Sequence, residues 1–181
     1  MPNWVALFRG VNVGGKNKIL MADLKRMFER LKCENVQTYI QSGNVVFSSK
    51  VKSKRVIAKR LLNATEEEFG FRSQPILLSA IEFKDAVKSN PFSHVVGDPK
   101  SLHFFFLESK PASPDLDGIA EKAIDSERFK MIDSIFYLHA PQGMGRSKLA
   151  AVAERKLGVS VTARNYSTVE RLLNILTERM S

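Results

Sequence analysis

The chain has 181 residues, of which 44% are hydrophobic, and this is the composition of an ordinary globular protein with one sizeable domain or two small ones. No apolar run approaches the roughly 20 residues of a membrane-spanning helix, and Trp4 to Phe8 follow the N-terminus without a leader pattern, so we expect a cytoplasmic protein with no membrane partner. The single cysteine, Cys33, excludes an internal disulfide and a cysteine-based zinc cluster.

The net charge of +9 is concentrated in the first half of the chain. Residues 1–80 carry 14 Lys and Arg against 6 Asp and Glu, whereas residues 81–181 carry 14 against 13. This asymmetry favours a phosphate-bearing ligand, nucleic acid or an acidic surface as a partner, and solubility is the alternative explanation.

The first half alternates strand and helix patterns. A strand is expected at Trp4–Val11, and a helix at Asp23–Leu31 follows from its apolar stripe. The further expected elements are strands at 36–41 and 45–48 around the Gly43-Asn44 turn, a helix at 53–69 between the Ser53 cap and the Gly70 stop, and a strand at 75–78. A short helix at 81–89 ends this half.

The second half repeats the order after a loop that contains Pro91, Gly97 and Pro99. The expected elements are a strand at 102–108, a helix at 115–124, a hairpin of 128–132 and 134–139, a helix from about Gly145, a short strand at 159–162 and a final helix from Tyr166 to Met180. The chain is therefore predicted to be α+β, with two tandem ferredoxin-like split βαββαβ units and mainly antiparallel sheets. The units span residues 1–90, the strongly basic one, and 91–181, which adds a C-terminal helix; the boundary falls near 90–100.

The first candidate site is the glycine-rich loop after the first strand. It contains Arg9, Asn12, Gly14, Gly15, Lys16 and Lys18. Glycines and cations in one turn can direct N–H groups and positive charge at an anion. Gly10 and Gly15-Lys16 also have Walker A spacing, but Asn17 stands where a P-loop needs Ser or Thr for magnesium, so we do not expect a P-loop. A purely structural connection is the alternative.

A second loop combines glycines, cations and a helix start at Gly145, Arg146 and Lys148. Cations are unfavourable at a helix N-terminus, so their presence suggests a negative partner, although both side chains could simply point into solvent. Arg164 and Asn165, just before the last helix, could join this cluster, and Asn165 could instead cap that helix.

Two further features bear on nucleic acid. Lys50, Lys52, Lys54, Arg55, Lys59 and Arg60 form the densest basic run, which would contact phosphates without reading sequence or would simply be a solvated face. Trp4, Phe8, Tyr39 and Phe47 could stack bases if they shared an exposed face, but we expect them in the core.

Catalytic and metal-binding groups are scarce. The three histidines lack metal-ligand spacing, so we expect no metal and no cofactor; His139 is a weak candidate acid or base, and a structural histidine is the alternative. The leading hypothesis is a binding protein for an anionic ligand or nucleic acid. The alternatives are an enzyme acting on a phosphorylated or acyl substrate, with Asn12, Gln41, Ser42, Asn44 and His139 in its site, and a protein-interaction module. The oligomeric state stays open.

Four separated segments resemble one bacterial family, called domain of unknown function 1697. They are residues 9–17, 39–47, 145–149 and 162–169, with sequences RGVNVGGKN, YIQSGNVVF, GRSKL and TARNYSTV. The resemblance implies a duplicated ferredoxin-like α+β fold and no particular activity. Tyr166 stands where the family usually has Trp, which keeps an aromatic packing role there.

Overall fold

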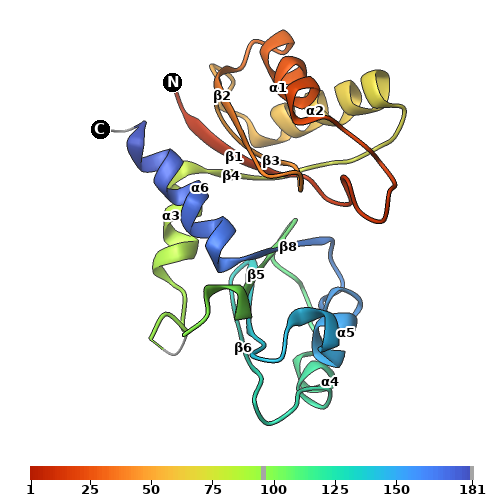
Figure 1. Ribbon diagram of the computed structural model, residues 1–181, viewed down its shortest axis with the longest axis vertical. Helices are drawn as coiled ribbons and strands as arrows, with labels where there is room; N and C mark the ends of the chain where they lie inside the picture. The colour runs from red at the N-terminus through yellow and green to blue at the C-terminus, as the bar shows by residue number, and fades with distance from the viewer. Residues whose placement is uncertain (95–96, 180–181) are drawn as a thin grey trace. The chain divides into compact units, whose positions relative to one another are not determined.

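The computed structural model describes residues 1–94 and 97–179, which form two compact units. The first contains Met1–Asp85 together with the described residues from Leu172 onward, and the second contains Ala86–Arg171. Each unit has one four-stranded antiparallel sheet with helices against it (Figure 1). In the described residues no helix is long and apolar enough to cross a bilayer.

The first unit has the predicted βαββαβ order, and a further helix follows it. Its elements are β1 (Asn3–Leu7), α1 (Met21–Arg30), β2 (Glu34–Tyr39), β3 (Asn44–Ser48), α2 (Lys54–Phe69) and β4 (Ile76–Ser79). The helix that follows, α3 (Ala80–Lys88), crosses the boundary between the units at Asp85. The strand order is β2-β3-β1-β4, and every neighbouring pair is antiparallel. This is the arrangement of a ferredoxin-like unit, so the predicted fold class is confirmed.

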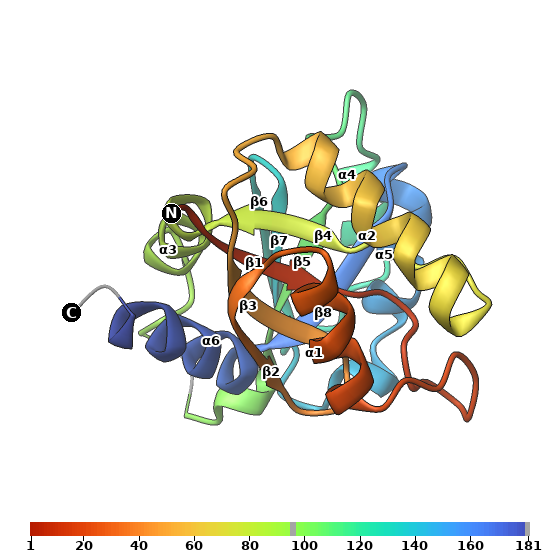
Figure 2. The same cartoon turned by 90° about the horizontal axis from the view of Figure 1, so that it is seen from above.

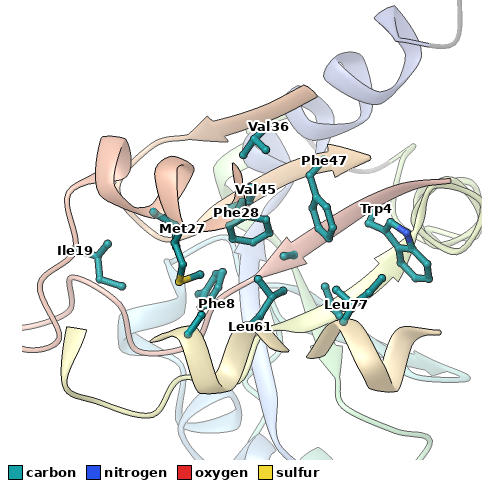
Figure 3. Packing of buried hydrophobic residues seen from close by; sticks show 14 of the residues in the cluster. Trp4, Phe8, Ile19, Met27, Phe28, Val36, Val45, Phe47, Leu61 and Leu77 are labelled. Carbon is teal, nitrogen blue, oxygen red and sulfur yellow. The ribbon is translucent and has the colours of Figure 1, made fainter. Parts of the chain in front are cut away.

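Aromatic rings fill the core of the first unit between one sheet face and the helices α1 and α2 (Figure 3). The rings of Phe28 and Phe47 meet edge to face with centroids 4.9 Å apart, and Phe8 meets Phe28 at 6.1 Å. Trp4 lies in the same cluster. Because these rings are buried, Trp4, Phe8 and Phe47 are core residues, as expected, and form no exposed surface for base stacking. Tyr39, which was expected in the core with them, is only partly buried.

The second unit repeats the topology. Its elements are the 3-10 turn η1 (Pro99–Ser101), β5 (Leu102–Leu107), α4 (Leu116–Ala120), β6 (Arg128–Ile132), β7 (Ile135–His139), the 3-10 turn η2 (Met144–Arg146), α5 (Lys148–Leu157) and β8 (Val161–Asn165). The last helix, α6 (Tyr166–Glu178), begins in this unit, and its residues from Leu172 onward belong to the first. The strand order β6-β7-β5-β8 matches that of the first sheet. Phe105, Phe136 and Leu138 pack against Leu149 and Leu157 of α5 in its core.

Several boundaries differ from those expected from sequence. β1 ends at Leu7 rather than Val11, because Gly10 turns the chain with a φ of 67°. α4 ends at Ala120 rather than Ile124, and β8 covers 161–165 rather than 159–162. The Ser53 cap and the left-handed Gly70 that ends α2 are confirmed. Residues 95–96, inside the expected boundary, and Met180, the expected end of the last helix, lie outside the described residues.

Candidate functional site

Asn12 organises the long loop between β1 and α1, which leaves the strand and extends outward before α1 begins (Figure 2). Its side-chain amide donates to the carbonyl oxygens of Ile19 (2.9 Å) and Gln41 (2.8 Å), and its Oδ1 accepts from the Ile19 N–H (2.9 Å). These bonds join the two ends of the loop to the β2–β3 hairpin. The Asn12 side chain therefore holds the loop in place.

Gly14 and Gly15 form the tip of a miniature hairpin inside this loop. Both have positive φ, 57° and 75°, and the Lys16 N–H donates to the Val13 carbonyl at 3.0 Å. Asn17 closes the hairpin, since its carbonyl accepts from the Asn12 N–H (3.1 Å). The glycines therefore serve a tight turn, and the P-loop arrangement, in which the lysine begins the helix, is absent here because α1 starts only at Met21.

The loop and α1 border a pocket of about 360 Å³. Its lining brings together four of the predicted residues with four others: Asn12, Gly15, Lys18, Ile19, Leu20, Asp23, Gln41 and Phe69. The volume is in the range of small-molecule sites. Leu20, which occupies the N-cap position of α1, is 70% exposed, and its side chain makes no hydrogen bond to the helix. The uncapped start of α1 therefore borders a pocket.

The charges around the pocket are unequal. Within the described part of the chain, neither Lys16 nor Lys18 has a carboxylate within ion-pair distance, and both are exposed. The one carboxylate of the lining, Asp23, pairs with Arg26 one turn along α1. Arg9 is exposed, and its carbonyl accepts a hydrogen bond from Ser73 at 2.8 Å. The local balance is therefore positive.

The segment from Gln41 to Asn44 leads into β3, and its last two residues have structural roles. Asn44 is fully buried and donates to the Tyr39 carbonyl (3.0 Å) and the Ser42 hydroxyl (2.9 Å). Gly43 lies against Phe8, whose N–H donates to the Gly43 carbonyl at 2.9 Å. Only Gln41 of this segment is exposed toward the pocket lining.

In the second unit the predicted loop forms η2 and the start of α5. Gly145, Arg146 and Lys148 are exposed there, and the helix is capped by Ser147, whose hydroxyl accepts from the Ala150 N–H at 3.0 Å. Because Ser147 supplies this cap, one of the unpaired N–H groups at the start of α5 already has a hydrogen-bond acceptor.

Arg164 and Asn165 both have structural partners. Arg164 on β8 is only 8% exposed and donates to the Thr162 hydroxyl (2.8 Å) and the Ala163 carbonyl (2.9 Å). Burial lowers the pKa of Arg164 to about 10. Asn165 caps α6 by accepting from the Thr168 N–H at 3.0 Å, as the alternative interpretation of the sequence held.

His139 ends β7 with its ring 6.5 Å from that of Phe92. Within the described residues no group of three His, Cys, Asp or Glu side chains could hold a metal ion. Sequence reasoning missed four residues of the pocket lining: Ile19, Leu20, Asp23 and Phe69. The uncapped Leu20 before an apolar periodic run was a usable signal, whereas Phe69 reaches the pocket only through the tertiary packing of α2.

The sequence model of a family described as "Protein of unknown function (DUF1697)" matches residues 1–137. The chain belongs to this family. The DUF1697 match includes the first two of the four motifs and ends before the others. The chain is also similar to a solved structure described as that of the conserved bacterial protein SP0830 from Streptococcus pneumoniae, with a TM-score of 0.72 and 25% identity over 97% of this chain and 98% of that one. None of the curated proteins compared with the chain matches it.

Proposed function

We propose that the pocket beside α1 binds a small anionic molecule, such as a phosphate ester, that also carries an apolar or planar body. The observation that supports this most directly is the uncapped start of α1 at a pocket lined by Lys18. The first N–H groups of a helix have no partner inside the helix, and the helix dipole adds partial positive charge there. An anion satisfies both needs at once.

The cations fit this role because they are not already neutralised. Lys18 lines the pocket, and neither it nor Lys16 forms an ion pair with any described residue. Gln41 adds a side-chain amide that can donate to a phosphate oxygen. Asp23 works against anion binding, but its pairing with Arg26 reduces that effect.

The apolar side of the pocket suggests the rest of the ligand. Ile19, Leu20 and Phe69 line it, and the Phe69 ring lies 6.5 Å from that of Phe71. A flat or apolar group bound against this side would bury surface that is now in contact with water. Asp23 and Lys18 are the titratable side chains of the lining, and the Asp23 carboxylate is paired with Arg26.

Isothermal titration tests the proposal with inorganic phosphate, pyrophosphate and adenosine monophosphate as probes. We expect the monophosphate to bind the wild type more tightly than phosphate does, and Lys18→Gln to weaken binding roughly 10-fold or more, the value of one charge-assisted hydrogen bond. Lys122→Gln removes the same charge from an exposed site in the second unit and serves as the control. Equal affinity in all three proteins, or no heat with any probe, would contradict the proposal.

A further inference from the structure

A separate group of cations lies at the start of α2 and in the segment before it. Lys50, Lys52, Arg55, Lys59 and Arg60 are all exposed; these five residues are called the basic face. The neighbouring Lys54 is exposed too, but its ammonium is 2.6 Å from Glu82. The five residues of the basic face lie within the eleven residues from Lys50 to Arg60, and none of them lines the pocket beside α1.

The cations of the basic face lack the partners that other cations in the same unit have. In α1, Lys25 pairs with Glu29, Arg26 with Asp23 and Arg30 with Glu68. By contrast, no carboxylate of the described residues lies within ion-pair distance of any member of the basic face. Positive charge is thus neutralised on α1 and left available on α2.

The order of charges along α2 opposes the helix dipole. The first turn carries basic residues and no acid, while Glu66, Glu67 and Glu68 lie near its C-terminal end. Helices are more stable with the reverse order. The acidic end is partly neutralised from outside α2, because Arg30 pairs with Glu68 and Arg72 with Glu66. The N-terminal end therefore keeps a concentrated positive potential at a cost in helix stability.

We infer that the basic face binds the phosphate backbone of double-stranded nucleic acid without reading its sequence. Closely spaced, unpaired cations suit a chain of phosphates better than a single one. Single-strand binders add exposed aromatic rings for stacking, and this stretch contains none. A membrane surface would need apolar side chains for insertion, and Val56 is the one markedly exposed apolar residue among residues 50–60.

The number of cations sets the salt dependence. Four or five phosphate contacts predict a slope of log affinity against log salt of about −4, so affinity should fall roughly 250-fold between 50 and 200 mM salt. Each cation removed should make the slope shallower by about 1. The affinity should be in the micromolar range or weaker at physiological salt and should not depend on base sequence.

Fluorescence anisotropy with two labelled 20-bp duplexes of unrelated sequence, and one single strand, tests this inference on the full chain. The test variant is Lys52→Gln/Arg55→Gln/Lys59→Gln. The control, Lys100→Gln/Lys122→Gln/Lys130→Gln, removes the same charge from exposed positions in the second unit. We expect the test variant to lose at least 10-fold in affinity with a slope near −1, and the control to bind as the wild type does.

The folding of the test variant can be checked independently, because relieving the unfavourable dipole should leave its thermal midpoint equal to or above that of the wild type. Absence of duplex binding at 50 mM salt, equal losses in test and control variants, or tighter binding of the single strand would each overturn the inference. Lys18→Gln should leave duplex binding unchanged, so this result and that of the pocket test are separate.

Discussion

The two units begin their first helices in different ways, although their sheets have the same topology. In the second unit Asp115 caps α4: its Oδ1 accepts from the Gly118 N–H at 2.8 Å, and its Oδ2 is 2.5 Å from the Lys156 ammonium. In the first unit Leu20 occupies the same position before α1 and supplies no hydrogen bond. In the second unit a carboxylate of the chain, that of Asp115, lies at the helix start. In the first unit the helix start has no such carboxylate cap and borders the pocket.

The loops that lead to these helices differ in the same sense. The chain between β5 and α4 contains two prolines, which restrict it, and no glycine. The longer connection between β1 and α1 contains three glycines and is held at both ends by Asn12. Two units of the same topology thus have one helix start capped by a side chain and one that borders the pocket proposed to bind an anion.

The largest loss of stability is expected from Gly43→Ala, because Gly43 lies in the turn between β2 and β3 that also contains Gln41. A Cβ at this position would lie 2.7 Å from the Cβ of Phe8, and the backbone has a φ of +75°. Overpacking and left-handed strain together should cost about 3 kcal/mol in urea unfolding. Gly14→Ala, where no atom lies within 4 Å of the added carbon, is the control for φ alone and should cost about 1–2 kcal/mol.

Asn12→Gly should release the loop while keeping its left-handed backbone, since the φ of Asn12 is 56°. Three hydrogen bonds are lost, so we expect a loss of about 2 kcal/mol of unfolding free energy together with weaker binding of the monophosphate probe. Urea denaturation gives the first quantity and calorimetry the second. Unchanged values for both would show that Asn12 does not hold the pocket open.

Leu20→Asp transfers the cap of the second unit to the first. The backbone of Leu20 already has the extended conformation of a cap, with φ −71° and ψ 136°. The new carboxylate should stabilise the protein by about 1 kcal/mol and should also occupy the place of the anion, so that probe binding falls at least 10-fold. Leu20→Ala adds no cap and serves as the control; a stabilised Leu20→Asp variant that binds normally would contradict the comparison.

The smallest effect concerns the pH dependence of the cap in the second unit. The hydrogen bond from Lys156, followed by that from the Gly118 N–H, holds the pKa of Asp115 below its ordinary value. A depressed pKa contributes stability above the unfolded pKa, and this contribution is lost as pH falls through the folded pKa. Asp115→Asn should therefore be less stable than the wild type at pH 7, and the difference should shrink on acidification below about pH 4. A constant difference across this range would contradict the account.

Local signals predicted much of the fold. Ser53 and Gly70 mark the ends of α2 because capping chemistry depends on neighbouring residues alone. The end of β1 was misplaced because Phe8 and Val11 are as buried as strand residues while lying in a loop, and apolar pattern cannot separate these cases.

The candidate site was only partly predictable. Glycine and lysine residues mark the loop in the sequence. The hydrogen bond from the Asn12 side chain to the Gln41 carbonyl joins residues that are 29 positions apart, so no local sequence pattern predicts it. Arg164 was expected at a ligand because it is a cation near a helix start, whereas β8 buries it beside Thr162. Charge and spacing show which residues can bind an anion, and tertiary packing decides which of them are available.

Amide NMR of the wild type titrated with adenosine monophosphate tests the contrast between the two helix starts most directly. We predict saturable shifts in residues 14–24, strongest at the Met21 and Ala22 N–H groups, and no shift at the Leu116 and Asp117 amides beside the Asp115 cap. Shifts at both helix starts, shifts spread over the surface lysines, or no shift at Met21 and Ala22 would contradict an anion site at the open start of α1.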